Sequence, residues 1–169
     1  MLLGASMVLA LPPFHIWPLL VLGFTGLVWM IDGIGFPNKP SFIGFKKCAG
    51  WSAFAVGWWF GLGFFMVGLY WISFSFLVDA ATFAWMIPFA VFGLSATMAV
   101  YIGLCSWVTF ITASAGLRRV FLIAIWWSLF EWLRGWVFTG FPWNLLGTVW
   151  TRIDGMTQLT AFTGVFGLS

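Results

Sequence analysis

Two charged side chains, Glu131 and Arg134, stand three residues apart in a stretch that is otherwise strongly apolar. Residues with this spacing share one face of an α-helix, so the carboxylate and the guanidinium can form an ion pair. If the helix crosses a membrane, each charge costs roughly 2.5–3.5 kcal/mol on insertion scales, and such residues are rare and usually functional. The pair is therefore the first candidate site.

The pair allows more than one interpretation. In the first, Glu131 and Arg134 form an intramembrane ion pair that holds one helix against its neighbours. In the second, Arg134 binds the phosphate or carbonyl of a lipid headgroup near the outer leaflet, and Glu131 orients the guanidinium, which can bind phosphate in a bidentate manner. A proton or ion relay is a third alternative. Asn144 and Gln158, two polar residues expected near the same surface, could serve either loop capping or substrate contact.

No catalytic residue is expected in this chain. Serine and threonine residues are scattered without a histidine or lysine at the same level, as an activated nucleophile would need. Cys48 and Cys105 have neither metal-binding nor redox spacing, and His15 is the single histidine. We therefore predict no metal site and no cofactor, and we interpret each cysteine as a small buried residue.

The composition defines the class of protein that holds these residues. Hydrophobic residues make up 63% of the chain and charged residues 7%, with a mean hydropathy of +1.07. A soluble domain carries about 25% charged residues, so the chain is predicted to be an integral membrane protein. The net charge of +3 comes from basic residues spread over several loops, which form no continuous track for phosphates. A nucleic-acid partner is therefore excluded.

The apolar runs predict an all-α, polytopic transmembrane bundle of about five spans plus the start of a sixth. The expected helices cover residues 1–11, 15–31, 48–78, 83–115 and 120–137, and another is expected to begin within 154–169. The run 48–78 would be ~46 Å long as a helix, against a hydrocarbon core of ~30 Å, so it must tilt or protrude. Within it Ala53, Gly57 and Gly61 form a small-residue stripe, which favours close approach of another helix.

The basic residues predict the topology. Three lysines in the loop 32–47 and the arginines Arg118 and Arg119 place these two loops in the cytoplasm, whereas the turn at Asp79 and the loop 138–153 then lie outside. Glu131 and Arg134 consequently belong to the outer half of the membrane. Four tryptophans are expected at the same level, namely Trp127, Trp132, Trp136 and Trp143.

The stretch Phe130–Trp143 resembles the motif of the apolipoprotein N-acyltransferase family, the bacterial inner-membrane enzymes that add the third acyl chain to lipoproteins. The family pattern closes a membrane helix and is matched here by Glu131, Leu133, Arg134, Gly135, Gly140, Phe141, Pro142 and Trp143. Weaker similarities, in the same order along the chain, lie around Trp17-Pro18 and in the glycine-rich segment 57–63.

The resemblance implies an activity that this chain does not contain in full. The family transfers an acyl chain from a phospholipid to the N-terminal diacylglyceryl-cysteine of a lipoprotein. The chemistry belongs to a nitrilase-like carbon–nitrogen hydrolase domain on the periplasmic side, with a Glu-Lys-Cys triad. Residues 1–169 contain no such domain, so they are expected to be an N-terminal transmembrane domain, a fragment that is inactive alone. The expected location is the bacterial inner membrane, with several crossings.

Two alternatives from other functional classes remain open. A small transporter or channel would need polar residues recurring across several spans, but the runs 48–78 and 83–115 contain no charged residue. A structural membrane subunit would use the ion pair only to pack helices. The substitution Arg134→Gln separates this last alternative from the acyltransferase, because a headgroup role predicts weak acylation by a folded protein and a packing role predicts loss of folded protein.

Overall fold

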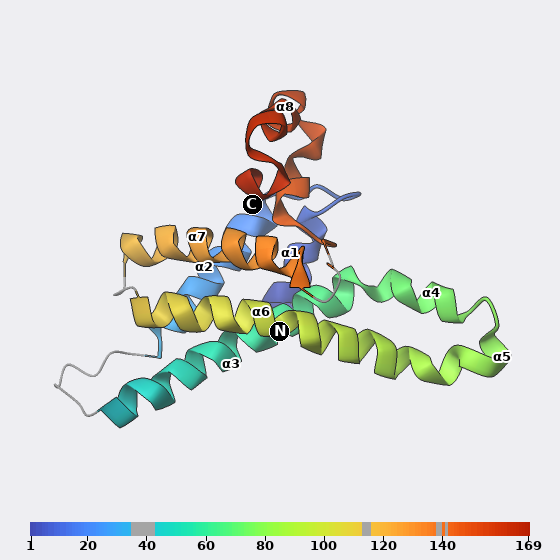
Figure 1. Ribbon diagram of the computed structural model, residues 1–169, viewed down its shortest axis with the longest axis horizontal. Coiled ribbons are helices and arrows are strands. Elements are labelled where there is room, and N and C mark those ends of the chain that lie inside the picture. The colour runs from blue at the N-terminus through green and yellow to red at the C-terminus, as the bar shows by residue number, and fades with distance from the viewer. Residues whose placement is uncertain (35–42, 113–115, 138–139, 141) are drawn as a thin grey trace.

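The computed structural model describes residues 1–34, 43–112, 116–137, 140 and 142–169, with the backbone alone for residues 43–48. These residues form helices and no strand, which confirms the all-α prediction for the described part (Figure 1). The elements in chain order are α1 Leu2–Met7, η1 Val8–Ala10, α2 Pro18–Asp32, α3 Ile43–Gly68, η2 Tyr70–Ile72, α4 Ser73–Phe76, α5 Ala80–Phe83, η3 Ala84–Met86, α6 Ile87–Thr112, α7 Leu117–Arg134, η5 Leu146–Arg152, α8 Asp154–Thr163 and η6 Val165–Leu168.

A long antiparallel hairpin organises the molecule (Figure 1). It consists of α3 with α4 and of α5 with α6, and α3 packs on α6 more extensively than any other pair of elements. The small-residue stripe lies in this contact: Ala53 is fully buried, and a Cβ atom on Gly57 would come within 2.6 Å of the carbonyl oxygen of Ile102. The predicted close approach of a second helix along the stripe is confirmed.

The apolar run 48–78 is not one helix. The helix α3 begins earlier, at Ile43, and ends at Gly68, where Leu69 leaves helical geometry with φ −109° and ψ 9°. The break coincides with a contact from elsewhere in the chain, because the side-chain amide of Asn144 lies against Gly68 so closely that a Cβ there would overlap it. Short helical segments, η2 and α4, continue beyond the break.

The N-terminal hairpin is formed as the prolines predict. Leu11 is extended (φ −75°, ψ 163°) and ends the helical stretch of α1 and η1 before Pro12 and Pro13. Pro18 occupies the first turn of α2, where a missing backbone N–H is tolerated. Helix α1 packs on both α2 and α3.

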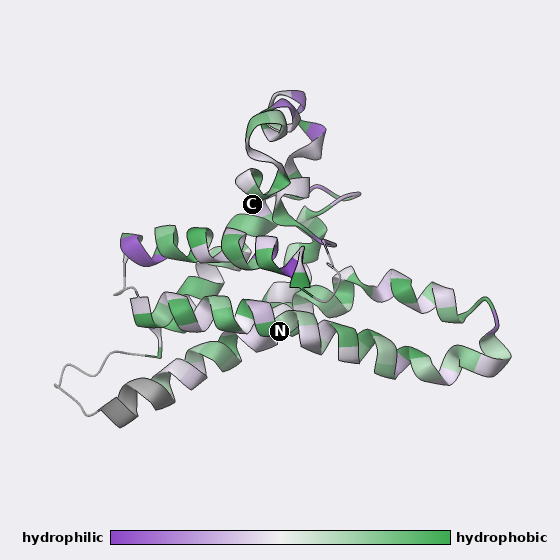
Figure 2. Cartoon of the chain, in the orientation of Figure 1, coloured by the Kyte–Doolittle hydropathy of each residue, from purple (hydrophilic) through white to green (hydrophobic). Residues whose placement is uncertain are grey.

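The surface of the long helices is apolar, but the predicted number of spans is not confirmed. Figure 2 shows mainly hydrophobic and neutral residues along the coloured part of the hairpin, with hydrophilic residues at the ends of α7, on α8 and at the turn between α4 and α5. Within the described residues, two helical stretches are long and apolar enough to cross a membrane, Ala49–Gly68 and Ala80–Thr112. The expected sixth helix is short, because α8 has 10 residues and ends at Gly164, whose φ is +68°.

The prediction for Arg119 needs correction. We interpreted it with Arg118 as a topology signal in a loop, and Arg118 is indeed exposed. Arg119, however, is 1% exposed within α7 and forms an ion pair with Asp32 at the end of α2. Its guanidinium also lies 5.7 Å from the ring centroid of Phe110 in α6. The charge therefore joins three helices at this end of the bundle.

Candidate functional site

The site begins where α7 ends. The N–H of Gly135 donates to the carbonyl oxygens of Glu131 (3.1 Å) and Trp132 (3.0 Å), which closes the last turn of the helix. Gly140 has φ +83°, and a Cβ at this position would collide with the carbonyl oxygen of Gly135. Glycine is therefore required at position 140, both for its backbone conformation and for the close return of the chain.

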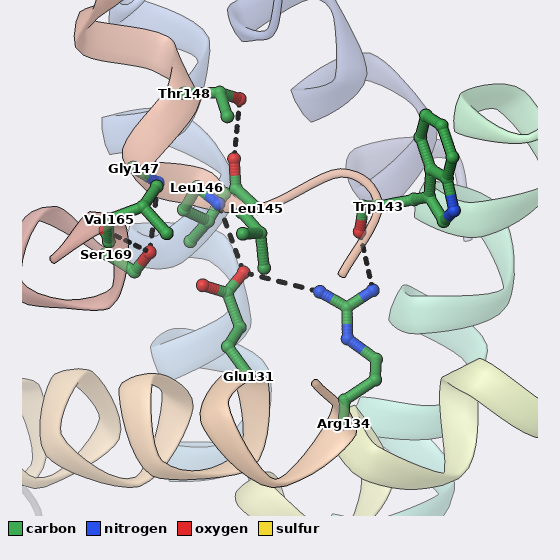
Figure 3. Close-up of polar contacts among 9 residues, drawn as sticks. All are labelled: Glu131, Arg134, Trp143, Leu145, Leu146, Gly147, Thr148, Val165 and Ser169. Atoms are coloured by element: carbon green, nitrogen blue, oxygen red, sulfur yellow. Dashed lines mark hydrogen bonds and ion pairs between the residues drawn. The ribbon is translucent and has the colours of Figure 1, made fainter. Parts of the chain in front are cut away.

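Arg134 holds the returning loop. Its Nη1 atom donates a hydrogen bond of 2.7 Å to the backbone carbonyl oxygen of Trp143 (Figure 3). The guanidinium carbon lies 5.0 Å from the ring centroid of Phe65 in α3, within the range of a cation–π contact. With 2% of its surface exposed, Arg134 is enclosed between α7, α3 and the loop.

Glu131 binds the same loop a few residues later. Its Oε1 atom accepts a hydrogen bond of 3.1 Å from the backbone N–H of Leu146 and lies 3.8 Å from Nη2 of Arg134 (Figure 3). Glu131 is 5% exposed. The two charges thus neutralise each other while each bonds a backbone group, although Oε2 of Glu131 is buried and has no hydrogen-bond partner among the described residues.

A small cavity lies beside the pair. Its lining includes Glu131, Arg134, Trp127, Tyr101 and Cys105, and its volume is about 10 Å³. This is close to the least space that one water molecule needs. A phosphate group does not fit there without a rearrangement of the side chains.

Pro142 and Trp143 of the motif lie on the exposed part of the loop. Trp143 is 51% exposed, and its ring centroid lies 5.1 Å from that of Trp71, which follows α3. Pro142 is exposed as well. Phe141, which the motif also includes, lies outside the described residues. The structure therefore brings Gly135, Gly140 and Trp143 together with the ion pair.

The four tryptophans predicted at one level have two different environments. Trp132 and Trp136 are 46% and 71% exposed and are available to a lipid interface, as is Trp143. Trp127 is instead 3% exposed and packs edge-on against Phe24 of α2, 4.9 Å between ring centroids. The difference arises because Trp127 lies one turn before Glu131, on the α7 face that packs into the bundle.

Sequence reasoning missed two polar residues, Ser169 beside the site and Asp32 at the other end of α7. Ser169 accepts a hydrogen bond of 2.9 Å from the N–H of Gly147, and Asp32 pairs with Arg119. Asn144, for which loop capping and substrate contact were both open, has φ +53°. A signal for the last was present, because asparagine is enriched at positive φ and here follows a proline and a tryptophan in a turn.

Comparison with known proteins identifies the family of this chain. Residues 3–169 match the family described as "Apolipoprotein N-acyltransferase N-terminal domain". The chain belongs to the apolipoprotein N-acyltransferase family. The resemblance read from the motif at the end of α7 is thereby confirmed.

Several apolipoprotein N-acyltransferases are similar to the chain over nearly all its length. The protein of that name from Rhizobium etli is 42% identical over 166 residues, which cover 98% of this chain and 30% of the relative. The protein from Rhizobium rhizogenes is 40% identical, and the match covers 99% of this chain and 31% of that relative. The protein from Rhodopseudomonas palustris is also 40% identical, and the match covers 100% of this chain and 30% of that relative. The chain thus corresponds to less than a third of these relatives and to the N-terminal domain of the family.

Proposed function

We propose that residues 1–169 are the membrane part of an apolipoprotein N-acyltransferase, which transfers an acyl chain from a phospholipid to the N-terminal diacylglyceryl-cysteine of a lipoprotein. The observation that carries this proposal is the match to the N-terminal domain of that family over residues 3–169. A catalytic carbon–nitrogen hydrolase domain, outside this chain, performs the transfer. This division agrees with the 30% of each relative that the chain covers.

The chain sits in the bacterial inner membrane and crosses it several times, in this proposal by α2 and α7 as well as by the hairpin of α3 and α6. The exposed side chains along these helices are largely apolar, as lipid contact requires. Helix α7 has 18 residues and is ~27 Å long, close to the thickness of the hydrocarbon core. Its two terminal charge pairs then lie near opposite faces of the membrane.

Glu131 and Arg134 serve in this proposal as a structural pair that shapes the outer end of the bundle. Both side chains already bond the backbone of the loop, at Trp143 and Leu146. The adjoining cavity of about 10 Å³ is too small for a phosphate, which argues against the headgroup alternative. The pair then presents a rigid loop toward the lipid and toward the catalytic domain.

An acylation assay tests the proposed function. The intact gene product that contains this region is purified in detergent and incubated with a phospholipid and a diacylglyceryl-cysteine peptide, and the mass of the peptide is followed. We expect the gain of one acyl chain. Residues 1–169 alone, assayed in parallel, should give none. Absence of transfer by the intact, folded protein would refute the activity, and transfer by residues 1–169 alone would refute the division of labour.

A further inference from the structure

A second and much larger cavity is lined in part by the loop that Arg134 holds. Its volume is about 320 Å³, within the range of small-molecule sites in proteins. Three segments far apart in the sequence form it: η1 with the turn after it, the end of α3 with η2, and η5 with the loop before it. The side chains that matter below are Phe14, Tyr70, Trp71, Asn144 and Thr148.

None of the described residues that line this cavity carries a charge. The guanidinium of Arg134 is not part of the lining and bonds the carbonyl oxygen of Trp143 and pairs with Glu131. A phosphate or ammonium group would find no opposite charge among these residues, and a charge held away from water without a partner is disfavoured. The occupant must therefore present a neutral group to the cavity.

Asn144 supplies an unused hydrogen-bond donor. Its Nδ2 atom is buried and has no hydrogen-bond partner among the described residues. Buried polar groups are nearly always bonded, so an orphan amide in a cavity wall calls for an explanation. An amide N–H₂ group needs an acceptor. Thr148 already donates its hydroxyl hydrogen to the carbonyl oxygen of Leu145, at 2.7 Å. Its hydroxyl group therefore does not compete with Asn144 for an acceptor on a ligand.

The backbone around the cavity is held in an unusual conformation. His15 and Asn144 are the residues other than glycine that have positive φ in the described chain, at +55° and +53°. His15 directly follows Phe14 in the wall, and its Nδ1 atom lies 3.3 Å from the carbonyl oxygen of Val149. Asn144 is fixed by the bond from Arg134 to the preceding residue. Such conformations cluster where a site is kept preformed.

Three aromatic side chains form a partly open section of the wall, which is otherwise mainly aliphatic. Phe14 and Tyr70 are each 59% exposed, and Trp71 is 38% exposed. Aromatic side chains with a polar end are favoured where one part of a ligand is apolar and another is wet. The cavity thus joins an apolar rim, a neutral interior and one buried donor.

From this combination we propose that the cavity binds the ester-linked glyceryl part of an acylated lipid, with the amide of Asn144 donating to an ester carbonyl. A rotation about the terminal torsion of Asn144, which is broad, turns the amide toward the ligand. This assignment rests on the proposed function in one respect only, namely that the bound lipid is a substrate of the acyl transfer. Both the phospholipid donor and the diacylglyceryl acceptor carry this ester chemistry.

Binding of two matched probes tests the proposal without any acyl transfer. Dioctanoylglycerol carries two ester carbonyls, and dioctylglycerol diether has the same chains and none. Binding of each to the detergent-purified chain is measured by equilibrium dialysis. We expect the diester to bind about tenfold more tightly than the diether.

The variants Asn144→Gly, which tolerates positive φ, and Asn144→Asp, which lacks the donor, should remove this preference while diether binding stays unchanged. Thr25→Ala in α2, outside the cavity, is the control and should keep the preference.

Equal binding of the two probes to the unmodified chain would overturn the proposal, as would an unchanged preference in both Asn144 variants. Loss of diether binding in both variants would overturn it too, because the amide would then only maintain the shape of the cavity. Binding of dioctanoyl phosphatidylethanolamine and of dioctanoylglyceryl-cysteine then distinguishes the phospholipid donor from the diacylglyceryl acceptor. The occupant is the lipid whose binding is weakened by the Asn144 variants. If neither depends on it, the assignment to a substrate is refuted even when the acylation assay succeeds.

Discussion

The guanidinium of Arg134 donates a 2.7 Å hydrogen bond to the backbone carbonyl of Trp143, nine residues later in the chain. A buried arginine is thus used to fix a loop and not to contact solvent. The loop in turn places the Trp143 ring against Trp71 and the Asn144 amide against Gly68. The end of α7, the end of α3 and the intervening loop therefore behave as one unit, and disturbing Arg134 should affect all three.

Breaking the ion pair should destabilise the protein. Arg134→Gln leaves the buried carboxylate of Glu131 uncompensated, and removal of one partner of a buried pair costs about 3–5 kcal/mol. Glu131→Gln should have a similar effect. The double variant should be less destabilised than the sum of the two, because no charge is left unpaired. Unfolding in SDS mixed micelles measures these differences, with Arg118→Gln, on the exposed neighbour of Arg119, as a control near zero. Additive effects, or a folded Arg134→Gln protein with weak acylation, would favour the headgroup role instead.

Gly140→Ala should be more harmful than Gly116→Ala. Both glycines have positive φ, +83° and +103°, so alanine is strained at either by about 1–3 kcal/mol. At Gly116 no described atom lies within 4 Å of an added Cβ, whereas at Gly140 the Cβ would collide with the carbonyl oxygen of Gly135. The difference between the two variants in unfolding free energy isolates the steric overlap. Equal losses would mean that the loop closes on α7 less tightly than described.

The packing of the hairpin can be tested with two glycines in opposite situations. Gly57→Ala places a Cβ within 2.6 Å of the carbonyl oxygen of Ile102, so α3 and α6 must separate, at a cost of about 1–3 kcal/mol. Gly93→Ala, within α6, meets no atom of the described residues within 4 Å and should stabilise the helix by about 0.5–1 kcal/mol. The measurement is again unfolding in mixed micelles. A stabilising Gly57→Ala would contradict the contact between the two helices.

The proposed membrane topology predicts which positions react from which side. Val78, 89% exposed at the turn between α4 and α5, should lie outside, and Leu117, 78% exposed at the start of α7, in the cytoplasm. In a background of Cys48→Ser and Cys105→Ala, a cysteine at position 78 should be labelled by an impermeant maleimide in intact spheroplasts. A cysteine at position 117 should react only after permeabilisation. Labelling of both from the same side would refute the arrangement.

Local features of this protein could be read from the sequence because they depend on residues close together in the chain. The register of Glu131 and Arg134, the stripe of Ala53, Gly57 and Gly61, and the break at Pro12-Pro13 follow from helical periodicity and from the missing N–H of proline. The motif that ends α7 is equally local. For this reason the family, the all-α class and the candidate ion pair were all predictable.

The tertiary structure alone decided which distant segments meet. Arg119 is paired with Asp32, 87 residues away, although its sequence context is that of a loop residue beside Arg118. Asn144 lies against Gly68, and the helix α3 stops there although the apolar run continues. Such contacts depend on how helices of similar composition are arranged in space. An apolar sequence specifies that its helices are buried or lipid-facing, but the partner of each polar group is chosen by the arrangement that leaves the fewest of them unsatisfied.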